Sequence, residues 1–183
     1  MADAQVVLLR AVNVGAKGTL PMEEFRQVLA AAGCREVRTV GVAGSAVLTS
    51  TSRVGEVLEE ELRRRLTVET GVVTELFVRG GAEWLRLERA NPFPLEAAED
   101  PSHTVLTVLS AAPTPQAWER LRARSHGPER IAAGERCAYL VYPNGIGRSP
   151  LTAAFLERQL EVRGTSRNWN TVKRLRELSV DPD

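Results

Sequence analysis

The stretch VRTVGVAGSAVLTST, residues 37–51, decides the fold. Its β-branched and aliphatic residues predict two strands, Val37–Val40 and Ala46–Thr51, and Gly41 and Gly44 mark the turn between them. Before this hairpin, the apolar run Val6–Leu9 predicts a buried strand. Apolar residues at spacings of three and four then predict a helix that Pro21 opens and Gly33 ends: Met22, Phe25, Leu29 and Ala32.

A helix and a strand are expected after the hairpin. Ser52 is the expected N-cap of this helix. Val54, Val57, Leu58, Leu62 and Leu66 give it an apolar stripe. Val72–Val78 is again strand-like, so the first part of the chain is predicted to have the order β-α-β-β-α-β.

The second part begins after Gly80 and Gly81. A short helix, Ala82–Ala90, and a surface loop, Leu95–Ser102, are expected first. Three further elements follow: the strand His103–Ser110, a helix opened by Thr114-Pro115, and a hairpin of Arg130–Ala133 with Cys137–Tyr142. Ser149-Pro150 is expected to open another helix, and a last helix carries Trp169, Val172, Leu175 and Leu178.

This second order is β-α-β-β-α-α, which repeats the first with its last strand replaced by a helix. We therefore expect an α+β protein with two related ferredoxin-like (split β-α-β) subdomains and antiparallel sheets. The expected boundaries are 1–80 for the first subdomain, 81–102 for a helix and connecting loop, and 103–183 for the second subdomain with its extra C-terminal helix.

Composition excludes several classes of protein. With 43% hydrophobic and 26% charged residues, the 183-residue chain does not resemble disordered, collagen-like or coiled-coil sequences. Two cysteines are too few for a disulfide framework or a zinc cluster. No apolar run approaches the roughly 20 residues of a membrane helix, and the first ten residues lack the pattern of a signal peptide. We expect a soluble cytoplasmic protein without a membrane partner, and its oligomeric state stays open.

Basic and acidic residues are nearly equal in number, but the basic residues are almost all arginine. The formal net charge is +1, from 24 basic and 23 acidic residues, so general attraction to nucleic acid is not implied. Lys17 and Lys173 are the only lysines, which makes arginine the dominant base. Arginine suits phosphate and carboxylate groups, but a compositional bias of the genome explains the same excess.

The first candidate site is the segment that contains Asn144, Gly145, Gly147, Arg148 and Ser149. It lies between a predicted strand and the helix expected at Pro150. The N-terminus of a helix favours anions, two glycines allow close backbone approach, and arginine adds a bidentate donor. The alternative is a tight turn, a serine cap and a solvated arginine, because the spacing fits no known phosphate loop.

Two more clusters are candidates. Arg167, Asn168 and Asn170 surround Trp169 and offer donors to a ligand, or they cap the last helix while the tryptophan joins the core. Arg10 and Asn13 follow the first strand, where loops often carry function. Their alternatives are an ion pair for the arginine and a simple turn for the asparagine.

The sequence gives little support for enzyme chemistry. His103 and His126 have no evident partner, and no spacing of histidines and carboxylates indicates a metal site. No cofactor is expected. If the protein is an enzyme, Tyr142 or Ser149 is the expected reacting group.

Four ordered motifs resemble a known family. They are LRAVNVG (9–15), NPFP (91–94), YPNGIGRS (142–149) and RNWNTV (167–172), and together they resemble the bacterial domain of unknown function family 1697. The resemblance implies two related ferredoxin-like subdomains and supplies no reaction. It also favours one shared site for Arg10, Asn13, Asn144, Arg148, Arg167 and Asn168.

The chain departs from the family pattern at several positions. Ala11 stands where glycine is usual, Pro150 where lysine is usual, and Val42, Ala43 and Ser45 lie where the family has a Gln-Ser-Gly-Asn-Val hairpin. These changes leave open whether this member has an altered or lost activity.

Three functions follow from these observations. The first is a binding protein for an anionic, phosphate-bearing ligand such as a nucleotide or nucleic acid, held by the three arginines. The second is an enzyme that acts on a small phosphorylated or carboxylated substrate. The third is a structural or interaction module without a ligand, in which Arg148 or Arg167 pairs with an acid such as Glu99 or Asp100.

Overall fold

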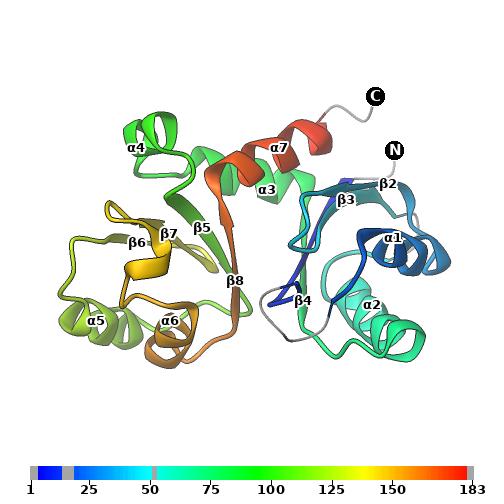
Figure 1. The fold of residues 1–183 in the computed structure, drawn as a ribbon, viewed down its shortest axis with the longest axis horizontal. Coiled ribbons are helices and arrows are strands. Elements are labelled where there is room, and N and C mark those ends of the chain that lie inside the picture. The colour runs from blue at the N-terminus through cyan, green and yellow to red at the C-terminus, as the bar shows by residue number, and fades with distance from the viewer. Residues whose placement is uncertain (1–3, 14–18, 51–52, 181–183) are drawn as a thin grey trace. The chain divides into compact units, whose positions relative to one another are not determined.

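A computed structural model describes residues 4–13, 19–50 and 53–180. The chain divides into two compact units (Figure 1). Unit 1 consists of residues 1–88 and 173–183, and unit 2 consists of residues 89–172. No helix within the described ranges is both long and apolar enough to span a membrane.

The sheet of unit 1 has four strands in the order β2-β3-β1-β4, and each neighbouring pair is antiparallel. Two helices connect the strands, which gives the β-α-β-β-α-β order of a ferredoxin-like fold. The elements are β1 (Ala4–Leu9), α1 (Met22–Ala31), β2 (Arg35–Val40), β3 (Ser45–Thr49), α2 (Gly55–Thr70) and β4 (Leu76–Gly80), and α3 (Gly81–Arg89) follows them.

The core of unit 1 lies between the sheet and helices α1 and α2 (Figure 1). Alternate residues of β1, Val7 and Leu9, point to this side and pack with Phe25 and Leu62 of the helices. Gly44 in the β2–β3 turn has φ +68°, and a methyl group added there would lie 2.6 Å from Cβ of Leu9. Glycine is therefore needed where the turn passes over β1.

Unit 2 repeats the same topology. Its sheet has the order β6-β7-β5-β8, again antiparallel throughout. The elements are α4 (Pro94–Glu99), β5 (Thr104–Leu109), α5 (Pro115–Arg124), β6 (Arg130–Gly134), β7 (Cys137–Val141), the 3₁₀ turn η1 (Ile146–Arg148), α6 (Ala153–Leu160), β8 (Gly164–Asn168) and α7 (Trp169–Val180). The predicted α+β fold with two ferredoxin-like halves is confirmed.

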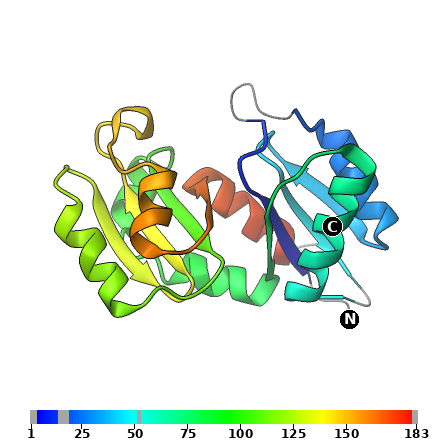
Figure 2. The same ribbon diagram turned by 90° about the horizontal axis from the view of Figure 1, so that it is seen from below.

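Helices α5 and α6 cover one face of this second sheet (Figure 2). Val105 and Leu109 of β5 pack there against Leu121 of α5 and Leu156 of α6. The predicted cap of α5 is present, since the hydroxyl of Thr114 accepts a hydrogen bond of 3.2 Å from the amide of Ala117.

Two predicted segments differ in the structure. The surface loop expected over Leu95–Ser102 contains the helix α4, which Pro94 opens and whose Ala97 is buried. The helix expected at Ser149-Pro150 begins only at Ala153, because Thr152 caps it by accepting from the amide of Phe155. The expected N-cap Ser52 lies outside the described residues.

The third difference is a strand that the sequence did not predict. The second half was expected to end in two helices, but β8 precedes α7 and pairs with β5 along its whole length. The sequence of β8, GTSRN, is polar and lacks the apolar alternation of a strand, so the pattern gave no signal.

Candidate functional site

The predicted site residues come from three segments of the chain. Arg10 and Asn13 belong to unit 1, and the other two clusters belong to unit 2. Within unit 2, β5 and β6 begin where β7 and β8 end, as the pairings Thr104–Val141 and Val105–Asn168 show. The segment before β5, the loop after β7 and the start of α7 therefore lie at one edge of the sheet.

Asn13 uses its carboxamide inside unit 1. Its Nδ2 donates to the carbonyls of Leu20, at 2.9 Å, and Val42, at 2.7 Å, while its Oδ1 accepts from the amide of Leu20 at 2.8 Å. Asn13 thus ties the segment after β1 to the β2–β3 turn. Only the backbone of Val42 takes part, so the departure from the family pattern at this position does not affect the contact.

Arg10 lies beside an acid of the same unit. Its Nε is 3.6 Å from Oε2 of Glu75, and its backbone amide donates to the carbonyl of Glu75 at 2.9 Å. The ion pair is partly exposed and contributes little to stability, about 0–1 kcal/mol.

Arg167 is buried on β8. Its Nη1 donates to Oγ1 of Thr165 and to the carbonyl of Ser166, both at 2.8 Å. Burial lowers the pKa of this guanidinium to about 10. Thr165 and Arg167 are two residues apart on β8, so their side chains lie on the same face of the strand, and both are buried.

The two asparagines near Arg167 have different roles. Oδ1 of Asn168 accepts from the amide of Thr171 at 3.0 Å and caps α7, as the structural alternative predicted. Asn170 is exposed, and its side chain forms no hydrogen bond with any residue that the structure describes.

The loop after β7 presents two polar groups to solvent. Gly145 has φ +85°, its amide donates to the carbonyl of Tyr142 at 3.0 Å, and the 3₁₀ turn η1 follows. Asn144 and Arg148 are exposed, and neither side chain has a hydrogen bond or ion pair with another described residue. The pairing of Arg148 with an acid, which the structural module required, is not found among these residues.

The two expected reacting groups hold this loop in place. Ser149 Oγ donates to Oε1 of Glu129 at 2.5 Å and accepts from the amide of Leu151 at 3.0 Å. Tyr142 donates to the carbonyl of Leu151 at 3.1 Å. Burial raises the pKa of Tyr142 to about 12, and the nearby carboxylate of Glu129 adds to the shift.

A partner for His103 was missed in the sequence. Nδ1 of His103 lies 2.7 Å from Oδ2 of Asp100, three residues earlier in the turn between α4 and β5. The spacing D-x-x-H in a turn is a signal that could have indicated it. The amides of His103 and Thr104 also donate to the carbonyl of Asp100, both at 3.2 Å, so the turn is fixed by its own backbone.

The imidazole faces the loop after β7. A methyl group added at Gly145 would lie 3.6 Å from Nε2 of His103. The carbonyl of His103 accepts from the amide of Tyr142 at 2.9 Å, which joins the turn to the start of the loop. With its Nδ1–H donated to Asp100, a neutral His103 carries its lone pair on Nε2.

Within the NPFP motif, Phe93 is buried and contacts the start of β6, whereas Pro92 and Pro94 are exposed. Asn91 Oδ1 accepts from the amide of Phe93 at 3.0 Å, and Phe93 is buried. The guanidinium of Arg130 stacks 4.6 Å from the centre of the phenyl ring and pairs with Glu96.

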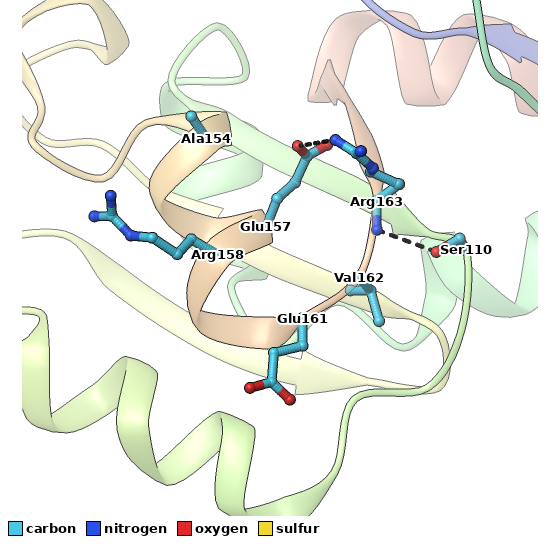
Figure 3. A pocket seen from close by; sticks show the side chains of 7 residues that line it. All are labelled: Ser110, Ala154, Glu157, Arg158, Glu161, Val162 and Arg163. Carbon is cyan, nitrogen blue, oxygen red and sulfur yellow. Dashed lines mark hydrogen bonds and ion pairs between the residues drawn. The ribbon is translucent and has the colours of Figure 1, made fainter.

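A separate hollow of about 480 Å³ opens in unit 2 beside α6. Figure 3 shows that Glu157 and Arg163 point toward each other, while Arg158 and Glu161 point away. Three of its four charged side chains form ion pairs: Arg163 pairs with Glu157 at 3.7 Å, and Glu161 pairs with Arg120 at 2.9 Å. The fourth, Arg158, lies 5.7 Å from the centre of the Phe155 ring and has no ion pair within the described residues. Its lining residues are Ser110, Ala154, Glu157, Arg158, Glu161, Val162 and Arg163.

The candidate functional site is thus the edge formed by Asp100, His103, Asn144, Gly145 and Arg148. Gly145 brings the loop that carries Asn144 and Arg148 beside the imidazole of His103. Within the described part of the chain, no group of three metal-ligating side chains occurs.

Comparison with known proteins agrees with the fold and names the family. The structure entitled "The structure of conserved bacterial protein SP0830 from Streptococcus pneumoniae" has a TM-score of 0.74 and 17% identity, and it covers 97% of this chain and 99% of its own. No curated protein matches the sequence significantly. The family model described as "Protein of unknown function (DUF1697)" matches residues 2–139, and the chain therefore belongs to this family.

Proposed function

We propose that this edge of unit 2 binds a small anionic molecule that carries a phosphate or carboxylate group. Arg148 and Asn144 supply the donors. The observation that carries the proposal is the exposed guanidinium of Arg148, which has no acidic partner among the described residues and belongs to the loop whose Gly145 lies beside Nε2 of His103.

The chemistry of these donors suits an anion. The guanidinium of Arg148 offers parallel N–H groups that match two oxygens of a phosphate or carboxylate. The Asn144 amide adds a neutral donor. Gly145 and Gly147 carry no side chain that would keep a ligand from the backbone.

A small ligand fits the site better than a nucleic acid. The net charge of +1 supplies no long-range attraction for a polyanion. Strands β1 and β3, at the centre of the sheet of unit 1, contain no aromatic residue on which bases could stack. A mononucleotide or a sugar phosphate needs only one anchored phosphate.

The other predicted residues support the site or the fold in this proposal. Ser149 fixes the loop through Glu129, and Asn168 caps the helix that starts at the same edge. Arg10, Asn13, Asn170 and Arg167 are not required as direct ligands.

Titration of ¹⁵N-labelled protein with inorganic phosphate and with AMP, at constant ionic strength, tests the proposal. We expect shifts of the Gly145 and Gly147 amides and at least a tenfold loss of affinity in Arg148→Ala. Arg122→Ala is the matched control, because Arg122 is exposed on α5 and has no ion pair within the described chain. Equal binding by the two variants, or no shifts in the loop, overturns the proposal.

A further inference from the structure

We propose that His103 is a general base that hydrolyses a phosphate monoester bound at the same edge, with Asp100 as its positioning residue. This inference rests on the proposed function, because Arg148 and Asn144 must hold the phosphoryl group beside the imidazole. It assigns a reaction and a substrate class to this binding site.

The first support is the fixed orientation of the ring. Asp100 accepts the Nδ1 proton at 2.7 Å, and it is the only described residue that bonds the side chain of His103. Three backbone contacts immobilise the turn: Asp100 O accepts from the amides of His103 and Thr104, and Pro101 O accepts from the amide of Trp169 at 2.9 Å. An imidazole held in this way needs no rearrangement before it accepts a proton.

The second support is access to Nε2. The side chain of His103 is 41% exposed, and the residue of the loop that lies beside Nε2 is Gly145, which carries no side chain. Arg148 follows three residues later in the same loop. A water molecule and a phosphate ester can therefore approach the ring from solvent, with the guanidinium available to the phosphoryl oxygens.

The reaction balances without any further reagent. An O–H bond of water breaks and its proton moves to Nε2, while the water oxygen forms a bond to phosphorus. The P–O bond to the ester group breaks, and the ester oxygen leaves with the bonding electrons. Asp100 stabilises the imidazolium formed, which then returns its proton to solvent.

The chain contains two histidines, so each can be replaced separately and the effects compared. The probe is 4-nitrophenyl phosphate, whose phenolate leaves without needing a proton. We expect His103→Asn to lose roughly 100-fold or more of the protein-dependent rate, within the range for removal of a general base. His126→Asn is the matched control, because His126 is exposed and has no partner in the described chain.

Asp100→Asn tests the positioning role separately. We expect a lower kcat with little change in KM, and a pH–rate profile whose acidic limb moves relative to the wild type. Asp100 is the charged group that faces the ring from its own turn, and the loop packed opposite presents the uncharged Gly145. An unchanged profile means that Asp100 only shapes the turn and overturns its part of the proposal.

Two results separate the failure of this inference from the failure of the proposed function. If phosphate binds at the loop but the wild type hydrolyses the probe no faster than buffer, or His103→Asn is as active as the wild type, the general base is wrong and the binding site stands. If phosphate does not bind, both fail. Modification by diethyl pyrocarbonate gives a second measurement: phosphate should protect His103 and not His126.

Discussion

Tyr142 links the stability of unit 2 to the geometry of the candidate site. Its ring lies in the core beneath the loop, and its hydroxyl donates to Leu151 beyond η1. The same tyrosine begins the loop that carries Asn144 and Arg148. A change in its ionisation is therefore expected to affect both the fold and the site.

Tyr142 predicts a loss of stability at high pH. Its pKa is raised from about 10 in the unfolded chain to about 12 in the fold, so the folded state retains the proton longer. The contribution is complete below pH 10 and is lost as the pH rises through 12. At pH 11 the wild type should lose about 1.4 kcal/mol through this group.

Tyr142→Phe checks that prediction. At pH 7 the variant should be about 1 kcal/mol less stable, because the hydrogen bond to Leu151 is lost. Between pH 9 and 11 its free energy of unfolding in urea should fall less steeply than that of the wild type. Parallel curves for the two proteins would contradict the assigned role of Tyr142.

For single residues, the sequence predicted exposed side chains in loops but did not predict burial or contacts within turns. Residue type and loop position were enough to select Asn144 and Arg148, which do face solvent. Arg167 was selected on the same grounds, but it is buried. Its burial was not predicted, because the strand that carries it was not recognised. His103 was set aside because its partner lies in a turn, where periodicity gives no information.

At the scale of elements, the apolar strands and helices were predictable and the polar ones were not. Val6–Leu9 and the helix stripe from Met22 have the periodicity of their structures. By contrast, β8 is a strand because β5 offers it a ladder of hydrogen bonds, which is a tertiary effect. Helix α6 also begins later than predicted, because Thr152 and not Ser149 caps it.

The start of α7 gives a prediction at this scale. Asn168→Ala should cost about 1 kcal/mol of stability, because the N-cap bond to Thr171 is lost. Asn170→Ala, two residues further on and exposed, should stay within about 0.5 kcal/mol of the wild type. Chemical denaturation of both variants measures the difference, and equal losses would show that the cap does not stabilise the helix.

At the scale of the whole molecule, one topology occurs twice. Both sheets have the strand order that the ferredoxin-like pattern requires, and both cores lie between the sheet and two helices. The first five elements of the repeat were predictable because the two hairpins and their preceding helices follow the same sequence of patterns, whereas the last strand of the second half, β8, was not. The return of residues 173–183 to unit 1 was not, because it depends on contacts distant in sequence.

Leu175 tests the assignment of α7. Within unit 1, α7 contacts α3 through Arg176, which pairs with Glu88 at 3.3 Å. Leu175 is fully buried, so Leu175→Ala should lower the free energy of unfolding by about 2–5 kcal/mol. Hydrogen exchange should become faster in α3. Arg174→Ala on the exposed side is the control, and a loss confined to unit 2 would contradict the assignment.

The path of the chain has a consequence during protein synthesis. Because residues 173–183 belong to unit 1, the ribosome makes all of residues 89–172 before it makes the segment that completes the first unit. The nascent first sheet must therefore wait, without its C-terminal helix, while the second unit emerges and folds. A slow step in translating or folding that second unit prolongs the time for which the first is incomplete and exposed to proteases and chaperones.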